Sequence, residues 1–314
     1  MKKKIALIFG ITGQDGSLLA NFLLKKKYKV YGVSRYLGIA NLKKLEIYKE
    51  IKVFKCKKII PKTIFKIIKK SNCDEIYYLS GQSSVLLSEK YPEETIVSNN
   101  FPLLIILEFI RKFNSKIRLF NASSSEIYGN NGNKKCGINT GYDPLSYYSL
   151  SKVISLELVK VYRKQFNLKV SNGILFNHES FLRKKNFFFQ KIISEAKLVK
   201  NKKKNNIIVG NLSISRDWGS ANEYITVMWK ILQVKPGDFI IATGKNYKLK
   251  KIVEIIFKKL ELDFKKTIKV SKNLFRKNEL MVTRADVHQT SKILKWKSKV
   301  DINSLVDSMI NNYV

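Results

Sequence analysis

The strongest constraint on the fold is a glycine pattern that directly follows an apolar segment near the N-terminus. Residues 5–9 read Ile-Ala-Leu-Ile-Phe, and Gly10, Gly13 and Gly16 follow at three-residue spacing before a helix-like stretch. Glycine permits a tight turn and a close approach of ligand to backbone, and a helix N-terminus offers free N–H groups to an anion. This order of strand, turn and helix predicts a site for a dinucleotide pyrophosphate.

The rest of the first half alternates apolar strand-like runs with helical stretches. Strands are expected at residues 29–33, 75–79, 117–121 and 170–176. Helices are expected at residues 17–26, 102–112 and around Leu156, and later at 188–199 and 222–232. Strands that are apolar throughout fit a sheet covered on both faces. We therefore predict an α/β fold, a doubly wound parallel sheet with a second, smaller α/β substrate domain.

The domain boundaries follow from where this alternation ends. Residues 1–175 are expected to form the nucleotide-binding domain, and residues 214–243 return to it through a strand at 239–242. The less regular segments 176–213 and 244–314 are expected to form the substrate domain.

The formal net charge of +36 raises the question of nucleic-acid binding. Of the 60 basic residues only eight are arginines, and the lysines are scattered along the whole chain. No basic tail and no nucleic-acid-binding motif occurs, so a compositional lysine background explains the charge better than a specific nucleic-acid partner.

The cysteines and the N-terminus bear on location. Cys56, Cys73 and Cys136 are odd in number and lack a CxxC pair, which argues against a disulfide framework and a metal site. The apolar run at residues 5–11 is too short for a membrane span and lacks a cleavage pattern, so we interpret it as a buried strand. These observations predict a cytoplasmic protein without a membrane segment.

A second group of residues suggests redox chemistry on a hydroxyl group. Tyr148 and Lys152 form a YxxxK motif, whose spacing places both side chains on one helix face. An adjacent ammonium is expected to lower the pKa of the phenol and make it a base. Ser124 and Glu126 follow a predicted strand, at the edge where a parallel sheet binds ligands. Arg35 ends the second strand, where an arginine suits a 2′-phosphate and therefore NADP.

At this point the chain resembles the extended short-chain dehydrogenases/reductases of the Rossmann type, and among them the GDP-mannose 4,6-dehydratase family. The similar stretches are 10–17, 79–83, 123–129, 172–180, 210–212, 216–219 and 241–244, together with Arg276 and Glu279. The most specific of these motifs for the family are Asn-His-Glu-Ser at 177–180 and Arg-Asp-Trp-Gly at 216–219.

The resemblance implies a lyase that uses NADP to oxidise carbon 4 of GDP-mannose, eliminates water across carbons 5 and 6, and returns the hydride to carbon 6. Tyr148 then acts as the base at the hydroxyl, Lys152 orients it, Ser124 donates a hydrogen bond and Glu126 takes the proton of carbon 5. The implied cofactor contacts are Gly10, Ile11, Thr12, Gly13, Gln14, Asp15, Arg35, Leu79, Ser80, Gly81, Gln82, Ser83, Tyr148, Lys152, His178 and Arg183. The implied substrate contacts are Ser83, Ser125, Asn177, Glu179, Asn211, Arg216, Arg276 and Glu279. The resemblance also implies a homodimer or homotetramer.

Several positions depart from this pattern. Glu94 replaces a tyrosine that contacts the cofactor, Phe9 replaces a threonine, and Phe181-Leu182 replace Pro-Arg. The segment after the third strand lacks a Gly-Asp-Leu sequence. Alternatives therefore stay open: a dehydratase of a related GDP-sugar such as a GDP-heptose, a GDP-4-keto-sugar reductase or epimerase, or a catalytically weak basic binding protein.

Overall fold

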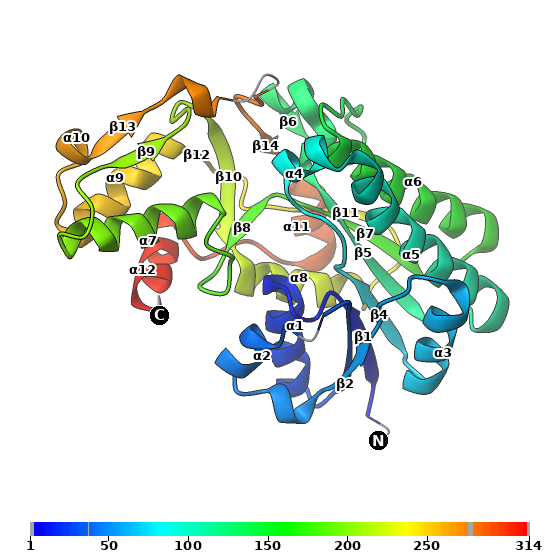
Figure 1. The fold of residues 1–314 in the computed structure, drawn as a ribbon. Coiled ribbons are helices and arrows are strands. Elements are labelled where there is room, and N and C mark those ends of the chain that lie inside the picture. The colour runs from blue at the N-terminus through cyan, green and yellow to red at the C-terminus, as the bar shows by residue number, and fades with distance from the viewer. Residues whose placement is uncertain (1–2, 37, 276–278, 313–314) are drawn as a thin grey trace.

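A seven-stranded sheet forms the centre of the molecule in the computed structural model, which describes residues 3–36, 38–275 and 279–312. Its strand order is β11-β7-β5-β4-β1-β2-β3, and every neighbouring pair is parallel. The strands are β1 (Ile5–Phe9), β2 (Lys29–Ser34), β3 (Lys52–Lys55), β4 (Glu75–Tyr78), β5 (Arg118–Ser124), β7 (Val170–Leu175) and β11 (Asp238–Ile241). The chain starts in the middle of the sheet and changes direction between β1 and β4, so the crevice for a ligand lies beyond the carboxyl ends of these two strands (Figure 1).

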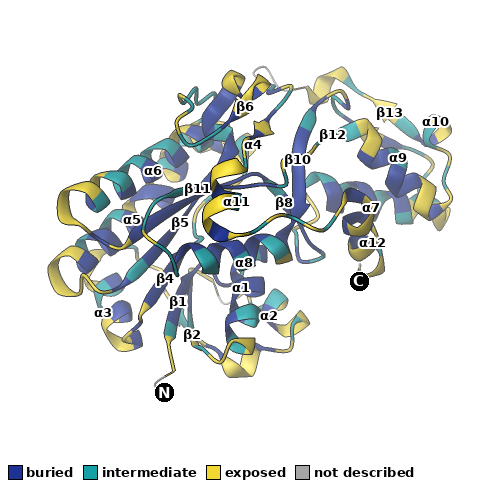
Figure 2. Ribbon diagram, turned by 180° about the vertical axis from the view of Figure 1, so that it is seen from behind, coloured by how far each residue is buried: buried dark blue, intermediate teal, exposed yellow. Residues whose placement is uncertain are grey.

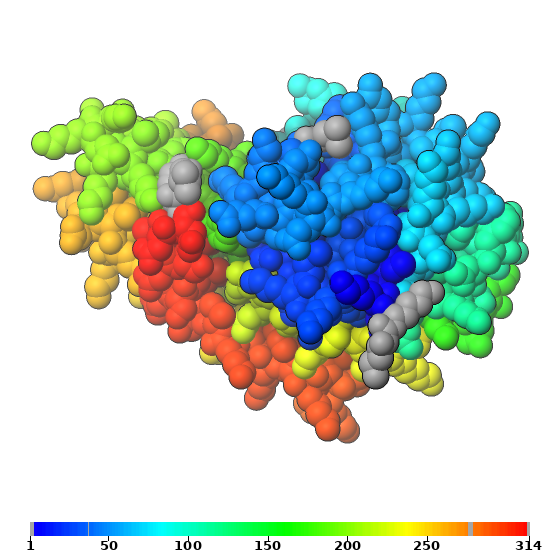
Figure 3. Space-filling model, turned by 90° about the horizontal axis from the view of Figure 1, so that it is seen from below, coloured from blue at the N-terminus to red at the C-terminus, as the bar shows by residue number. Residues whose placement is uncertain are grey.

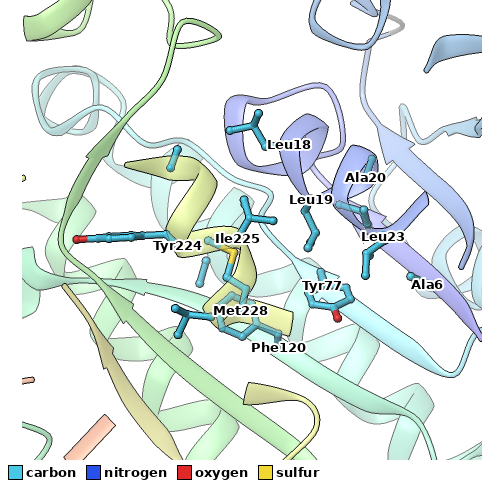
Figure 4. Packing of buried hydrophobic residues seen from close by; sticks show 14 of the residues in the cluster. Ala6, Leu18, Leu19, Ala20, Leu23, Tyr77, Phe120, Tyr224, Ile225 and Met228 are labelled. Carbon is cyan, nitrogen blue, oxygen red and sulfur yellow. The ribbon is translucent and has the colours of Figure 1, made fainter. Parts of the chain in front are cut away.

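Helices cover both faces of this sheet, which confirms the predicted doubly wound α/β fold. On one face lie α1 (Gln14–Lys25) and α8 (Ala221–Ile231), and on the other lie α3 (Pro61–Ser71), α5 (Pro92–Phe113) and α6 (Tyr147–Phe166). Figure 4 shows Leu19 and Leu23 of α1 and Met228 of α8 packed toward Tyr77 and Phe120 of the sheet. Burial on both faces explains why the strands are apolar throughout (Figure 2).

A smaller region packs beside the carboxyl edge of the large sheet. Its three-stranded sheet has the order β12-β10-β8, and a separate two-stranded sheet pairs β13 with β9. These strands are β8 (Asn177–Glu179), β9 (Ile207–Val209), β10 (Ser215–Ser220), β12 (Asn246–Lys248) and β13 (Ile268–Val270). The helices α7 (Phe188–Lys200), α9 (Leu249–Leu260) and α12 (Ile302–Asn311) enclose its own apolar core. Figure 3 shows segments of both regions from below, the N-terminal part in blue and the C-terminal part in red.

Shorter elements connect these layers. They are the helices α2 (Ala40–Lys44), α4 (Val85–Lys90), α10 (Phe264–Thr267) and α11 (His288–Leu294), the 3₁₀ segments η1 (Tyr48–Glu50), η2 (Ser125–Asn133) and η3 (Lys272–Leu274), and the paired strands β6 (Lys135–Cys136) and β14 (Arg284–Ala285). Within the described residues, no helix is long and apolar enough to cross a membrane.

The helix expected at residues 102–112 begins ten residues earlier, so Pro102 lies in the interior of α5. Proline lacks an N–H group and leaves the carbonyl four residues before it without a helical partner. The buried Tyr78 hydroxyl donates to that carbonyl, the Ser98 oxygen, at 3.1 Å, and it lies equally close to the Asn99 oxygen. A side chain from β4 therefore makes the proline tolerable, a compensation that the local sequence does not reveal.

Candidate active site

The glycine-rich turn after β1 is shaped by contacts that exclude any side chain. Gly10 has a φ of +85°, and a Cβ atom there would lie 2.7 Å from the Leu79 oxygen. A Cβ atom on Gly16 would lie 2.2 Å from the Gly10 oxygen. Both contacts fall below van der Waals distance, so these glycines allow the turn to pass closely between β4 and α1.

The first turn of α1 is open to an anion. Gly13 occupies the N-cap position and no side chain caps the helix, so the cap leaves its first N–H groups open to a ligand. A helix N-terminus of this kind carries a partial positive charge and binds phosphate. The two glycine positions and the uncapped helix thus fit the pyrophosphate of a nicotinamide dinucleotide, at the edge where the chain changes direction. Ile11, Thr12 and Gln14 belong to the same turn.

The opposite wall of the crevice is the loop after β4, which contains Leu79, Ser80, Gly81, Gln82 and Ser83. Gly81 has a φ of +129°, and a Cβ atom there would collide with the Asn99 side chain. Asn99 Nδ2 donates to the Gln82 oxygen at 3.1 Å and to Ser151 Oγ at 2.7 Å. Asn99 thereby ties this loop to α6. Ser83 is exposed.

The groups expected to be catalytic come together from β5, η2 and α6. Ser124 ends β5, Glu126 follows in η2, and Tyr148 and Lys152 lie in the first turns of α6. Ser124 Oγ accepts from the Glu126 N–H at 3.3 Å, and both residues influence the ionisation of Tyr148: Ser124 favours it and Glu126 opposes it. The reciprocal capping box of Ser146 and Ser149 fixes the start of α6, and therefore the direction of Tyr148.

The ionisation of this pair differs from the prediction that the ammonium lowers the pKa of the phenol. Burial raises the pKa of Tyr148 to about 12, against an opposing hydrogen bond from Ser124. Burial also lowers the pKa of Lys152 to about 8. The prediction is wrong for this arrangement because Lys152 Nζ donates to the Ala122 oxygen at 2.9 Å and lies 5.8 Å from the centre of the Tyr148 ring.

A buried ion pair connects β8 with the glycine-rich turn. His178 Nε2 lies 2.9 Å from Asp15 Oδ2, and His178 Nδ1 lies 2.7 Å from the Phe176 oxygen. Burial by itself lowers the pKa of His178, but the Asp15 carboxylate outweighs it and raises that pKa. In return, His178 outweighs the effect of burial on Asp15 and lowers its pKa to about 2. The pair therefore favours a charged imidazolium beside the crevice.

A second ion pair lies next to it, with Glu179 buried and Arg183 partly exposed. Glu179 Oε2 and Arg183 Nε are 3.7 Å apart, and neither atom has a hydrogen-bond partner among the described residues. Burial raises the pKa of Glu179 to about 7, although Arg183 opposes this shift. Arg183 also lies over the Phe187 ring, with its guanidinium carbon 3.7 Å from the ring centre.

Three residues that were expected to act in catalysis or to bind substrate line one cavity. Glu126, Arg216 and Glu279 face it together with Leu145, Ser146 and Leu280. Arg216 projects from β10, is 7% exposed, and donates from Nη1 to the Ser215 oxygen at 3.0 Å. With Glu89, which also lines the cavity, the arrangement places one cation and three carboxylates from separate parts of the chain at one opening. Arg276, which was expected to join them, lies outside the described residues.

The other residues expected to contact substrate are more dispersed. Ser125 is buried at the start of η2, and Asn177 is half-buried in β8. Asn211 lies in the small region after β9, where its Oδ1 accepts from the Ser213 N–H at 2.9 Å and its Nδ2 contacts Met281. The structure thus places Asn211 in a local turn and does not bring it to the cavity shared by Glu126 and Arg216.

The family is decided by the extent of a sequence match. A family model described as GDP-mannose 4,6 dehydratase matches residues 7–309, which is nearly the whole chain. The chain belongs to the GDP-mannose 4,6-dehydratase family. This membership confirms the resemblance that the motifs indicated.

Individual relatives of the GDP-mannose 4,6-dehydratase family support this assignment. A GDP-mannose 4,6 dehydratase of Drosophila melanogaster is 33% identical over 98% of this chain and 86% of its own length. A GDP-mannose 4,6-dehydratase of Sinorhizobium fredii is 31% identical over 98% of this chain and 96% of its own length. The fold is also that of a solved dTDP-glucose 4,6-dehydratase from Bacillus anthracis in complex with NAD, with a TM-score of 0.86 over 99% of this chain and 96% of that chain, at 16% identity.

Two buried polar residues that position parts of the site were not predicted from the sequence of this GDP-mannose 4,6-dehydratase family member. Asn99 is buried and connects the β4 loop to α6. Asp217 is buried in β10 and accepts from the N–H groups of Thr243 and Gly244 at 2.9 and 2.7 Å, although burial raises its pKa to about 6. Asp217 lies in the Arg-Asp-Trp-Gly segment, which was a usable signal, whereas Asn99 lies in a helix with no distinctive spacing.

Proposed function

We propose that this protein converts GDP-mannose to GDP-4-keto-6-deoxy-mannose and water. Family membership supports the reaction, and the observation that carries it is Glu126 bonded through its N–H to Ser124 Oγ at 3.3 Å and lying near Tyr148. Reduction or epimerisation of a 4-keto sugar needs a tyrosine and a hydride carrier. Elimination of water needs in addition a carboxylate that can remove the proton of carbon 5.

NADP is the cofactor in this proposal. The uncapped start of α1 would hold the pyrophosphate, Arg35 the 2′-phosphate, and the loop at residues 79–83 the opposite side. When bound, the nicotinamide supplies a reversible acceptor for the hydride of carbon 4. Because the hydride removed from carbon 4 is returned to carbon 6, the complete reaction has no net redox change.

Tyr148 removes the hydroxyl proton at carbon 4, and Ser124 stabilises the developing charge through its hydrogen bond. Lys152, whose Nζ donates to the Ala122 oxygen and lies 5.8 Å from the centre of the Tyr148 ring, orients the tyrosine. Glu126 takes the proton of carbon 5 that the new ketone acidifies. The bond between carbon 6 and its oxygen then breaks, and the hydroxide leaves with one of the two protons as water. The second proton is returned to carbon 5, so protons and electrons balance.

The small region and the cavity beside Glu126 accommodate the rest of the substrate in this proposal. Residues 176–213 and 244–314 form the nucleotide-sugar domain, and residues 1–175 with 214–243 form the cofactor domain. Arg216 is suited to a diphosphate because a guanidinium binds its oxygens in a bidentate manner. Glu279 accepts hydrogen bonds from hydroxyl groups of the sugar nucleotide. The remaining proposed substrate contacts are Arg276, Ser83, Ser125, Asn177 and Glu179, without Asn211, which is held in its local turn.

The test is incubation of the purified protein with GDP-mannose and NADP, followed by separation of the products by mass. The expected product is lighter than GDP-mannose by one water. Parallel incubations with a GDP-heptose and with a GDP-4-keto sugar plus NADPH test the alternative substrates. Absence of the dehydrated product from GDP-mannose, together with turnover of either alternative, would overturn the substrate assignment.

A homodimer or homotetramer is part of this proposal, supported by exposed apolar side chains on α5 and α6. Val97, Phe101, Leu150 and Val161 are exposed on these two helices, which pack against each other on one face of the sheet. An exposed apolar stripe on paired helices fits a second copy of the same surface. We expect Phe101→Glu to lower the mass measured by sedimentation, whereas Ile208→Glu, at an exposed position on β9, leaves it unchanged. An unchanged mass in Phe101→Glu would contradict this interface.

A cytoplasmic location is also proposed, since Cys56, Cys73 and Cys136 are buried free thiols. Fractionation of cells that express the protein tests this location. Recovery with the membrane pellet would contradict it.

A further inference from the structure

One ion pair joins the two walls of the crevice at the end where β2 stops. Arg35 follows β2, and Glu94 lies in the first turn of α5. Their Nη1 and Oε1 atoms are 3.5 Å apart. Ser34, the neighbour of Arg35, lies 3.2 Å from Thr12 of the glycine-rich turn through their hydroxyl oxygens. The ion pair is therefore anchored beside the turn proposed to hold the cofactor.

This pair contributes little to the stability of the fold. The side chains of Arg35 and Glu94 are 44% and 59% exposed, and exposed pairs of this kind are weak because water and salt screen them. Among the described residues, the Glu94 carboxylate accepts no hydrogen bond from the backbone. A ligand can replace a weak ion pair at low free-energy cost. The Arg35–Glu94 pair is therefore expected to change ligand affinity more than the stability of the fold.

Arg35 stands where a dinucleotide fold distinguishes a ribose 2′-phosphate from a 2′-hydroxyl. A phosphate monoester at neutral pH carries between one and two negative charges. Like a carboxylate, it accepts hydrogen bonds from guanidinium N–H groups. A 2′-phosphate must therefore displace Glu94 from Arg35 or accept it as a close like charge. A neutral 2′-hydroxyl meets neither penalty.

We infer that Glu94 sets the cofactor selectivity of this chain by competing with the 2′-phosphate for Arg35. Arg35 by itself favours NADP, and Glu94 reduces that preference relative to NAD. The inference rests on the cofactor part of the proposed function. It concerns the strength of cofactor binding and is independent of which sugar nucleotide the protein converts.

The test measures dissociation constants of NADP and NAD by calorimetry, in the absence of any sugar nucleotide. We expect Glu94→Gln to tighten NADP binding about three- to fivefold, the range of an exposed ion pair, and to change NAD binding by less than about twofold. Glu93→Gln is the matched control, because Glu93 occupies the same helical turn and is exposed. It is expected to leave both constants within about twofold.

A double-mutant cycle with Arg35→Gln tests the proposed competition. Arg35→Gln is expected to weaken NADP more than NAD, and on that background Glu94→Gln should change the NADP constant by less than about twofold. Equal effects of Glu94→Gln on NADP and NAD, or an effect that persists in full without Arg35, would overturn the inference. Unchanged binding of both cofactors in Glu94→Gln would also overturn it. Loss of dehydration of GDP-mannose with this pattern intact would instead count against the proposed reaction alone.

Discussion

The two ends of the cofactor crevice are built from opposite kinds of polar contact. At the catalytic end His178 is buried between Asp15 and the Phe176 oxygen, and Glu179 is buried beside Arg183. At the β2 end, Arg35 and Glu94 form a single exposed contact. Burial strengthens electrostatic interactions and shifts pKa values, whereas exposure weakens them. We therefore expect substitutions at the catalytic end to change rates and pH dependence strongly, and those at the β2 end to change affinity modestly.

The largest effect is expected for Tyr148→Phe. Removing the hydroxyl group removes the base for the first step, and general base catalysis contributes up to about 10⁴-fold. The turnover of GDP-mannose is the quantity to measure. Tyr147→Phe is a matched control, since Tyr147 is the preceding residue and its side chain is exposed. If both variants keep the wild-type turnover, the buried end does not carry the chemistry.

Glu126→Gln is expected to lower dehydration by about 10³-fold because the proton of carbon 5 then lacks a base. Oxidation at carbon 4 does not need this carboxylate. Reduced cofactor should consequently accumulate, which its near-ultraviolet absorbance reports. Dehydration at the full rate in Glu126→Gln would remove the assigned role from this residue.

The sequence predicts the local motifs of the site but not the contacts between distant segments. The glycine-rich turn and the segments around Ser124 and Tyr148 are short local motifs, so their positions were predictable. Contacts between distant segments were not: Glu94 lies 59 positions after Arg35, and the Tyr78 hydroxyl that makes Pro102 tolerable comes from another element. The direction of the Tyr148 pKa was missed for a related reason. It depends on burial and on the bond from Lys152 to Ala122, which spacing along a helix does not specify.

Glu179→Gln tests the buried end through stability. The pKa of Glu179 is raised from 4.5 to about 7, so the folded state holds the proton more tightly than the unfolded state. Below pH 4.5 the carboxyl group of Glu179 therefore does not lower the free energy of unfolding. As the pH rises through 7, it lowers that free energy by up to about 3 kcal/mol. We expect the free energy of unfolding of Glu179→Gln to improve relative to wild type between pH 5 and pH 8, by about that amount. A difference between Glu179→Gln and wild type that stays constant with pH would contradict the raised pKa of this buried group.

The smallest effect is expected at the exposed end. Arg35→Lys keeps the charge but loses the bidentate geometry of the guanidinium, so NADP binding should weaken by about fivefold. Titration of the protein with NADP at low and high salt measures this change. A loss of several hundredfold would show that Arg35 acts as a buried anchor and that the contrast between the two ends does not hold.

In the proposed reaction one site oxidises carbon 4, eliminates water and returns the same hydride to carbon 6. GDP-mannose carrying deuterium at carbon 4 tests this hydride return directly, with mass spectrometry and NMR of the product. The expected product has lost one water and carries the deuterium at carbon 6, without net reduction of NADP. A product without deuterium at carbon 6, or a stoichiometric gain of reduced cofactor, would contradict it.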